Sequence, residues 1–208
     1  MKKPSLEVEV KFLLSDFRSY ENKVRSIGAV LVQPRTHELN YRFDTADLRL
    51  THNHQVLRLR QDNATILTYK GPAQSDRIVS IRPEIEIEVN DFQSAKELLE
   101  ALGYDLQVKY EKWRTVYRIE DLELTIDEMP FGNFTEIEGG DPAALHRMAS
   151  ILALNWSARI MDSYLLLFDR LKTNKKLTLV DLTFENLRSV SVAPEDLGVK
   201  AADTPLFI

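Results

Sequence analysis

Charged and apolar residues alternate strictly near the start of the chain, over residues 6–13. Glu7, Glu9 and Lys11 occupy every second position, and the positions between them are apolar. Successive side chains of a β-strand point to opposite faces, so this spacing places the three charges on one side. The segment is therefore predicted to be a strand with one charged face.

Similar strand patterns recur along the chain and are separated by turn-forming residues. They cover residues 29–43, 56–60, 65–70, 78–89, 108–119, 122–129 and 134–138. Asp62-Asn63 and Glu120-Asp121 are predicted to close hairpins between neighbouring strands. The pattern indicates a protein dominated by antiparallel β-structure.

A few segments instead show apolar residues at helical spacing behind a helix-starting residue. The start signals are Asp16, Asp91, Asp141-Pro142 and Asp162, and Gly28 and Gly103 end the first two helices. The last two helices are predicted to reach about residues 152 and 171. Residues 1–171 are predicted to form one domain, with residues 172–208 as an extension that packs on it.

Most of the predicted strands carry a charged face. One such strand is typical of an ordinary solvated surface in an antiparallel sheet. The pattern recurs, however, in Arg58 and Arg60, Lys70, Glu84, Glu86 and Glu88, Lys112 and Arg114, Asp127, and Glu136 and Glu138. The opposite faces are apolar, and we expect them to point outward beneath helices, as at Ile85, Ile87, Val89, Ile126 and Ile137. The predicted fold class is α+β, an antiparallel eight-stranded-type tunnel β-barrel with a charged interior.

Composition narrows the classes of partner. The 208-residue chain has a net charge of −5, so no general attraction to nucleic acid or to anionic lipid is expected. It has no cysteine, which excludes disulfides and thiolate metal sites. No apolar run is long enough to span a bilayer and the N-terminus has no signal-peptide pattern, so a cytoplasmic protein that binds no membrane is expected.

The residue types of the charged faces favour phosphate and metal chemistry. Arginine guanidinium groups suit phosphate oxygens, and a polyphosphate needs several cations that converge on it. Carboxylates gathered in one interior would repel one another unless a cation lies among them. Mg²⁺ or Mn²⁺ binds carboxylate and phosphate oxygens together, so one of these ions is the expected cofactor.

The segment Leu6-Glu7-Val8-Glu9-Val10-Lys11 resembles the Glu-x-Glu-x-Lys signature of the CYTH family, which includes class IV adenylyl cyclases and thiamine triphosphatases. Further matching motifs follow in order up to about residue 167. They are Tyr41-Arg42-Phe43-Asp44-Thr45, Arg58-Leu59-Arg60, Tyr69-Lys70-Gly71-Pro72, residues 84–88, Lys112-x-Arg114, Asp127, Glu136-Ile137-Glu138 and Ser163-Tyr164. The resemblance implies a triphosphate tunnel fold and a small-molecule triphosphate as substrate. Family members are often dimers, so a homodimer is a candidate assembly.

The resemblance also implies roles for individual residues. The implied metal ligands are Glu7, Glu9, Asp127, Glu136 and Glu138. The implied triphosphate-binding cations are Lys11, Arg58, Arg60, Lys70, Lys112 and Arg114. Lys70 and Glu86 are the candidate catalytic residues, with Glu84 and Glu88 as alternatives for the position of Glu86. Which of these groups accepts a proton stays open at this point.

Three functions are compatible with this set. A metal-dependent triphosphatase needs only the cations, the metal and water, and is preferred for that reason. A class IV-type adenylyl cyclase would use the same cations on ATP but needs a pocket for the base. A non-catalytic polyphosphate-binding module would not need the acidic residues. Gln55-Val56-Leu57-Arg58 lacks the tryptophan that mammalian-type thiamine triphosphatases carry near the first tunnel arginine, which disfavours a thiamine-specific enzyme.

Overall fold

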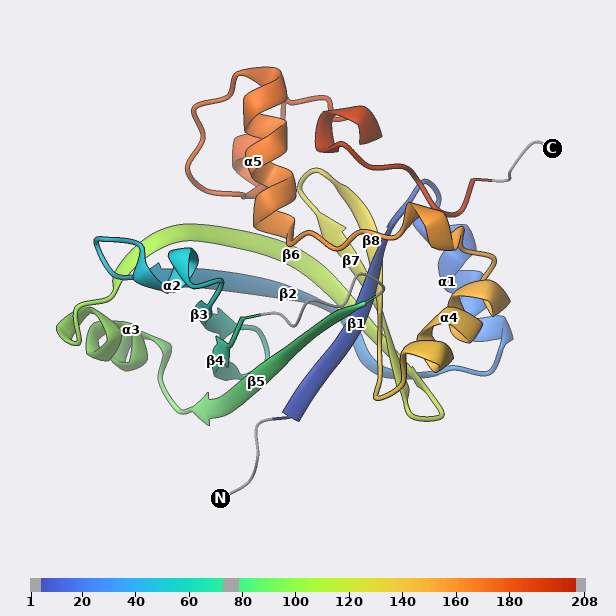
Figure 1. The fold of residues 1–208 in the computed structure, drawn as a ribbon, viewed down its shortest axis with the longest axis horizontal. Helices are drawn as coiled ribbons and strands as arrows, with labels where there is room; N and C mark the ends of the chain where they lie inside the picture. The colour runs from blue at the N-terminus through green and yellow to red at the C-terminus, as the bar shows by residue number, and fades with distance from the viewer. Residues whose placement is uncertain (1–4, 73–78, 205–208) are drawn as a thin grey trace.

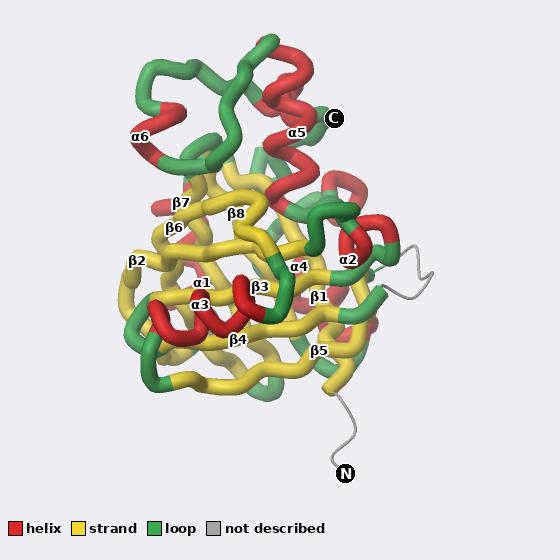
Figure 2. The backbone as a smooth tube through the Cα atoms, turned by 90° about the vertical axis from the view of Figure 1, so that its left-hand side faces the viewer, coloured by secondary structure: helices red, strands yellow, loops and turns green. Residues whose placement is uncertain are grey.

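The computed structural model describes residues 5–72 and 79–204, with the side chains of residues 5–7 left aside. Within these residues, eight antiparallel strands form one ring in the order β1-β5-β4-β3-β2-β6-β7-β8, and β1 closes it by pairing with both β5 and β8. Figure 2 shows these strands stacked around the barrel. The strands are β1 (Ser5–Leu14), β2 (Val30–Asp44), β3 (Val56–Gln61), β4 (Thr65–Lys70), β5 (Ser80–Val89), β6 (Asp105–Ile119), β7 (Leu122–Met129) and β8 (Gly132–Glu138). The predicted α+β class and the ring of eight antiparallel strands are confirmed.

Strand register explains why the charges gather inside. Glu9 pairs with Glu138 and Lys11 pairs with Glu136, so the charged faces of β1 and β8 lie on the same side of the sheet. The predicted hairpins are present, because β3 pairs with β4 and β6 pairs with β7 across short turns. The predicted strand start at Ile78 lies outside the described residues, and β5 begins at Ser80.

Three predicted helices start where their capping residues indicate. Asp16, Asp91 and Asp141 each accept hydrogen bonds from backbone amides of the first turn. The fourth prediction was wrong at both ends, because Ser163 caps the helix in place of Asp162 and the helix continues to Lys175. The helices are α1 (Phe17–Ser26), α2 (Arg49–His52), α3 (Phe92–Ala101), α4 (Pro142–Ile151), α5 (Tyr164–Lys175) and α6 (Phe184–Leu187).

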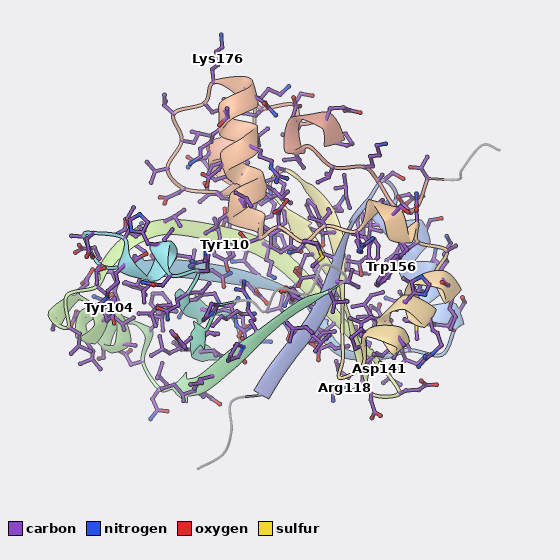
Figure 3. All side chains as sticks on the ribbon, in the orientation of Figure 1. Tyr104, Tyr110, Arg118, Asp141, Trp156 and Lys176 are labelled. Carbon is purple, nitrogen blue, oxygen red and sulfur yellow. The ribbon has the colours of Figure 1, made fainter. Side chains whose placement is uncertain are left out.

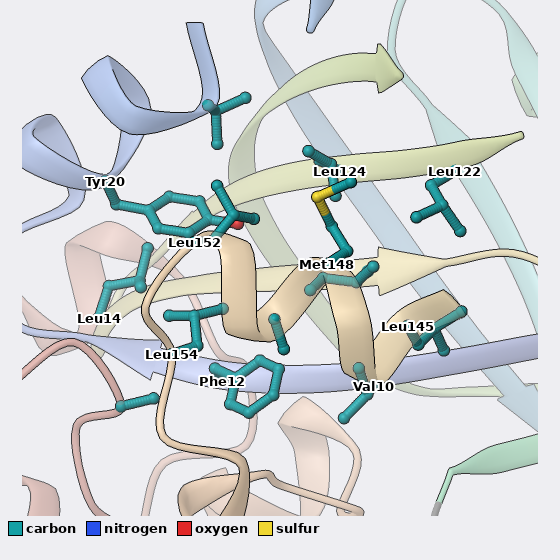
Figure 4. Close-up of a cluster of buried hydrophobic side chains, with 14 of the residues drawn as sticks. Val10, Phe12, Leu14, Tyr20, Leu122, Leu124, Leu145, Met148, Leu152 and Leu154 are labelled. Carbon is teal, nitrogen blue, oxygen red and sulfur yellow. The ribbon is translucent and has the colours of Figure 1, made fainter. Parts of the chain in front are cut away.

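The largest apolar core lies outside the barrel, between the sheet and two helices. The outer faces of β1, β7 and β8 contribute Val10, Leu124 and Ile137, each exposed by at most 1%. Tyr20 of α1 and Leu145 of α4 complete this cluster, as the close-up in Figure 4 shows for α4 against β1 and β7. Ile126 and Ile137 therefore point outward beneath helices, as expected. Burial of these side chains holds the charged interior in place, at roughly 1.5–3 kcal/mol per residue.

The prediction that helices cover the outer face of β5 was wrong. Ile85 and Ile87 do point outward, but 49% and 52% of their surfaces remain exposed. In Figure 1, α3 lies at one end of the barrel and α1 and α4 at the other. The cluster under α3 includes Leu59 of β3 and the partly buried Val89, and Ile81 packs against the larger cluster. Cover therefore reaches only the two ends of the outer face of β5. Strand alternation sets the direction of these side chains, whereas the path of the chain decides whether a helix reaches them.

The segment after α5 packs on the barrel beside that helix, as Figures 1 and 2 show. Leu182, Leu187 and Leu197 are buried in one cluster with Phe134 of β8. The backbone of Leu182 exchanges hydrogen bonds with Lys109 and Glu111 of β6. Near the chain end, the Asp203 carboxylate accepts hydrogen bonds from the backbone amides of Ser15 and Asp16, at 2.7 and 2.9 Å. Among the described residues, no helix combines the length and the apolar composition that crossing a membrane requires.

Asp44, at the end of β2, organises the turn that follows. Its carboxylate accepts hydrogen bonds from the backbone amides of Thr45, Leu50 and Thr51, each at 2.8 Å, and from the Thr51 hydroxyl at 2.7 Å. Burial alone would raise the pKa of Asp44, but these hydrogen bonds lower it below its ordinary value of 3.8.

We expect Asp44→Asn to lower the free energy of unfolding by about 1–3 kcal/mol at pH 7, because an amide nitrogen cannot accept these hydrogen bonds. A depressed carboxylate pKa contributes stability that is present above the unfolded pKa and is lost as the pH falls through the folded one. The difference between the two proteins should therefore shrink below about pH 4. Urea denaturation at several pH values measures it, with Asp169→Asn on the exposed face of α5 as the control. A constant difference down to pH 2 would contradict this explanation.

Candidate functional site

The barrel encloses a cavity of about 420 Å³ whose wall is mostly charged. Inward-facing residues of β1, β2, β3, β5, β6 and β8 form most of it, because alternation on each strand places every second side chain there. The segment before α5 adds Met161, Asp162 and Ser163, and α5 adds Tyr164 and Leu165. The cavity therefore brings together charges from segments that are far apart in the sequence.

One side of the cavity is rich in arginine. Arg42, Arg58, Arg60 and Arg82 line it. The buried Nε atoms of Arg42, Arg58 and Arg82 have no hydrogen-bond partner among the described residues, whereas Arg60 Nε lies 3.3 Å from an Asp62 oxygen. Burial lowers the pKa of Arg42, and the neighbouring Arg58 and Arg82 lower it further. Buried donors of like charge are costly to leave unpaired, so this arrangement favours an anionic ligand.

Tyr110 stands between this arginine group and Lys112. It is 8% exposed and lies on the inner face of β6, near the base of α5 in Figure 3. Burial alone would raise its pKa, but Arg58, Lys112 and Arg42 together lower it. Burial would likewise lower the pKa of Arg58, but the charge and hydrogen bond of Tyr110 and the nearby Glu38 and Glu86 raise it instead.

The opposite side of the cavity is built on a buried ion-pair network around Asp127. The Asp127 carboxylate is fully buried and accepts hydrogen bonds from Arg114 Nε at 2.6 Å, Lys112 Nζ at 2.9 Å and the Tyr164 hydroxyl at 2.9 Å. Both of its oxygens are occupied, because a second Arg114 nitrogen also donates to it. A metal ion could bind Asp127 only by displacing one of these partners.

Glu136 extends the network toward β1. Its oxygens lie 3.2 Å from Lys11 Nζ and 2.6 Å from an Arg114 nitrogen. Burial alone would raise the pKa of Glu136, but Lys11, Arg114 and Lys112 lower it well below its usual range. Lys11 and Arg114 therefore already offset part of the repulsion between the carboxylates of the cavity. From the sequence, a metal ion alone was expected to offset this repulsion.

Glu9, Glu138 and Glu123 form a row across three strands. Glu138 pairs with Glu9 of β1 on one side and with Glu123 of β7 on the other, and all three side chains line the cavity. Directly opposed like charges on neighbouring strands destabilise a sheet. The row therefore has the local chemistry of a cation site.

The structure brings together most of the residues that the sequence predicted for the site. Those on the cavity wall are Glu9, Lys11, Arg58, Arg60, Lys70, Glu86, Lys112, Arg114, Glu136 and Glu138. Asp127 lies behind the wall and contacts Lys112 and Arg114. The backbone of Glu7 pairs with Arg82, but its side chain lies outside the described part of the chain. The metal, substrate and catalytic roles of these residues remain predictions.

The candidate catalytic residues both lie on the wall with partners. Lys70 Nζ lies 3.4 Å from Glu84, and Glu86 accepts a hydrogen bond from Thr68 at 2.8 Å. Burial would raise the pKa of Glu86, but Thr68, Arg58 and other nearby cations lower it, so Glu86 is a weak base in this state. Of the alternatives, Glu84 lines the main cavity, whereas Glu88 lines a separate pocket beside the β3–β4 turn.

Several residues of the cavity wall had no predicted role. They are Glu38, Arg42, Arg82, Tyr110, Glu123 and Tyr164. The signal was available for Arg82 and Glu123, which lie on the same alternating faces as Glu84 and Asp127. Glu38 and Arg42 likewise lie on one face with Asn40 midway between them, and the register of β2 has no shift between the two. Tyr164 comes from a helix outside the barrel, so no strand pattern could indicate it.

The donor set fits a divalent ion of the Mg²⁺ or Mn²⁺ type. Its atoms are carboxylate oxygens, from the facing pair Glu9 and Glu138 and from Glu136, without sulfur or imidazole. Among residues 5–72 and 79–204, no group of three or more such side chains is already arranged as a complete site. Mg²⁺ at phosphate sites typically uses one or two carboxylates together with substrate oxygens and water, so the pair is sufficient.

The fold and the cavity define a class, that of antiparallel barrels with a charged, arginine-rich interior. The chain belongs to the CYTH family, because the model of the CYTH domain matches residues 5–160. A protein of Methanocaldococcus jannaschii named as a candidate adenylate cyclase is 30% identical over 135 residues, which are 64% of this chain and 76% of that protein.

Solved structures share the fold. A candidate adenylate cyclase from Vibrio parahaemolyticus superposes with a TM-score of 0.70 at 24% identity, covering 80% of this chain and 99% of that one. A protein from Hippeastrum, described as a candidate adenylyl cyclase with a dominant triphosphatase activity, has a TM-score of 0.59 at 22% identity and covers 78% of this chain and 95% of that one. About a fifth of this chain thus lies outside each of these superpositions.

Proposed function

We propose that the protein is a divalent-metal-dependent triphosphatase that removes the terminal phosphate of a small-molecule triphosphate bound in the barrel. One observation carries the proposal. The cavity holds three buried arginine Nε atoms, those of Arg42, Arg58 and Arg82, that have no hydrogen-bond partner among the described residues, together with a row of carboxylates. Such donors match phosphoryl oxygens, and such carboxylates match the cation that accompanies a polyphosphate.

In this proposal the arginine side of the cavity binds and orients the substrate. Arg58 and Arg60, with Lys70, hold phosphoryl oxygens and neutralise charge that develops on the leaving diphosphate. Lys11, Lys112 and Arg114 reach the substrate from the opposite side while they stay near Glu136 and Asp127. A divalent ion held by Glu9, Glu136 and Glu138 would lower the charge of the terminal phosphoryl group when bound.

A class IV-type adenylyl cyclase is the second candidate, and the names of the Methanocaldococcus and Vibrio proteins favour it. The described triphosphatase activity of the Hippeastrum protein supports hydrolysis instead. The cavity wall also offers little apolar surface to a nucleobase, since Val56, Val116, Met161 and Leu165 are its aliphatic members. The acidic residues argue against a module that binds polyphosphate without reaction, because such a module needs only the cations.

The proposal is tested with purified protein and Mg²⁺ or Mn²⁺ in separate reactions with tripolyphosphate, thiamine triphosphate and ATP. We expect orthophosphate and a diphosphate product from at least one of them. Quantification of orthophosphate, pyrophosphate and cyclic AMP distinguishes the two enzymes. Cyclic AMP with pyrophosphate as the main products would establish the cyclase instead.

Metal removal should abolish turnover without unfolding the protein. Because lysine and arginine already pair with Asp127 and Glu136, the fold is stabilised without a divalent ion. We expect excess EDTA to lower hydrolysis by at least about 100-fold, since several kcal/mol of charge stabilisation would be lost. The melting temperature should change by less than about 4 °C, which corresponds to roughly 1 kcal/mol. Full activity in EDTA would contradict the role of the metal.

We further propose that residues 172–208 belong to the same folding unit as the barrel. The burial of Leu182, Leu187 and Leu197 against Phe134 supports this assignment. The single domain, a homodimer and a cytoplasmic location stay predictions from the sequence.

A further inference from the structure

Glu38 is a buried carboxylate whose position the proposed reaction has not yet used. It lies on the inner face of β2, opposite Lys112 of β6, and is 1% exposed. It lines the cavity with the small part of its surface that is exposed, whereas its Oε2 atom is buried. A buried carboxylate normally has hydrogen-bond partners for both of its oxygens.

The contacts of Glu38 are weaker than those of its neighbours. Its Oε2 atom lies 3.5 Å from Lys112 Nζ, and its Oε1 atom lies 3.8 Å from Arg114 Nε. Both cations are closer to Asp127, at 2.9 and 2.6 Å. Glu38 Oε2 accepts no hydrogen bond within the described part of the chain. One oxygen of Glu38 is therefore a buried acceptor on the cavity wall that is not yet used.

We propose that Glu38 is the proton acceptor that activates the attacking water, an inference that rests on the proposed triphosphatase function. The water oxygen forms a bond to the terminal phosphorus, and one water proton passes to the Glu38 carboxylate. The bond between that phosphorus and the bridging oxygen breaks, and its electron pair leaves with the diphosphate. Orthophosphate and diphosphate are released, and Glu38 then returns its proton to solvent.

The surroundings of Glu38 make its basicity depend on the substrate. Burial raises its pKa and is the largest single influence, but Lys112, Arg114, Arg60 and Arg58 together lower it to about 2. These same cations face the cavity and would share their charge with a bound triphosphate. Once these cations pair with the triphosphate, they lower the pKa of Glu38 less. The increase in its pKa that burial causes is then no longer offset, and the carboxylate becomes a stronger base. The nearby Asp127 has both oxygens engaged by Arg114, Lys112 and Tyr164, so neither is open to the attacking water.

The other candidate bases fit this role less well. Glu86 already accepts a hydrogen bond from Thr68 and is 43% exposed at its side chain, so water screens the effect of substrate on it. Lys70 Nζ lies 3.4 Å from Glu84, so its nitrogen is already engaged by a carboxylate. Glu38 combines burial, access to the cavity and an unused oxygen.

Glu38→Gln tests the proposal in steady-state and binding measurements on the substrate that the wild-type protein hydrolyses. We expect kcat to fall by about 10²–10⁴-fold, the usual contribution of a positioned base. Binding of that triphosphate, measured by calorimetry with Ca²⁺ in place of the active metal, should stay within about threefold or tighten, because a negative charge beside a polyanion is lost. The acidic limb of the kcat–pH profile that belongs to Glu38 should disappear from the residual rate. Glu128→Gln, on the outer face of β7, is the matched control and should keep both parameters.

The outcomes separate this proposal from the proposed function. Absence of hydrolysis by the wild-type protein with every triphosphate would refute the triphosphatase itself. Hydrolysis by the wild type with an unchanged kcat in Glu38→Gln, or with a raised KM and an unchanged pH profile, would show that Glu38 only balances the charge of Lys112. If Glu38→Gln fails to fold, Glu38→Asp keeps the charge and withdraws the oxygens by one methylene. That variant should lose about 10-fold or more in kcat, and an unchanged kcat would equally overturn the proposal.

Discussion

Arg58→Ala is expected to lower turnover by about 10²–10³-fold, the usual effect of losing one donor that stabilises developing charge. Arg58 is well placed for this effect, since it lines the cavity and its Nε atom has no partner among the described residues. The hydrogen bonds of its NH2 group, to Thr68 at 3.2 Å and Glu86 at 3.5 Å, are long, and Arg58 also bonds Tyr110. The loss should appear in kcat/KM for the triphosphate that the wild type hydrolyses.

The same substitution should leave stability similar or higher. Arg58 lies beside Arg42 and Arg82, and its charge lowers the pKa of Arg42, which is a sign of repulsion within the group. Removing one of several crowded cations relieves that repulsion, as is common where a site is organised for a ligand. We expect the free energy of unfolding to change by less than about 1 kcal/mol, or to rise. Arg147→Ala, at an exposed position of α4, is the control that should alter neither property. A strongly destabilised Arg58→Ala would show that Arg58 supports the barrel instead.

Strand periodicity predicted the fold and much of the cavity because it depends on a local rule. Every second residue of a strand faces inward, so Glu9, Lys11, Arg58 and Arg60 could be placed on one surface from spacing alone. The same rule also places Glu38 and Arg42 on one face, because the register of β2 with β6 has no shift between them. Elsewhere in β2 the register shifts between Leu31 and Gln33, between Gln33 and Thr36, and between Arg42 and Phe43. A bulge adds a residue and reverses the faces beyond it, which sequence spacing does not show.

The pairing of charges depends on tertiary structure and could not be read from the chain. The sequence treated Arg58 and Arg114 as equivalent substrate-binding cations. In the structure, the pairing of β6 with β7 places Arg114 opposite Asp127, whereas Arg58 faces Thr68 of β4 and a second arginine, Arg42. Arg114 is therefore engaged at short distance by two protein carboxylates, whereas Arg58 has one long contact with a carboxylate, Glu86, and lies beside other arginines. This difference decides what each residue contributes to stability.

Arg114→Ala is accordingly expected to lower the free energy of unfolding by about 3–5 kcal/mol, the usual effect of removing one partner from a buried ion pair. Arg114 donates to Asp127 from two nitrogens and to Glu136 at 2.6 Å, and burial of Asp127 is complete. Without Arg114, Asp127 keeps Lys112 and Tyr164, and Glu136 keeps Lys11, so both buried carboxylates lose part of their compensation.

Urea denaturation measures this loss, and two further variants define its cause. Arg114→Lys should recover only part of the stability, because an ammonium group cannot bridge two carboxylates as a guanidinium does. Arg118→Ala removes an arginine from the same strand whose side chain is 58% exposed and whose partner Glu123 is 3.3 Å away. The Arg118→Ala substitution should lower the free energy of unfolding by at most about 1 kcal/mol, which is the usual contribution of a surface ion pair. If the Arg114→Ala protein is as stable as the Arg118→Ala protein, Lys11, Lys112 and Tyr164 are enough to compensate the buried carboxylates of Asp127 and Glu136. Arg114 would then serve the ligand of the cavity, as Arg58 does, and not the stability of the fold.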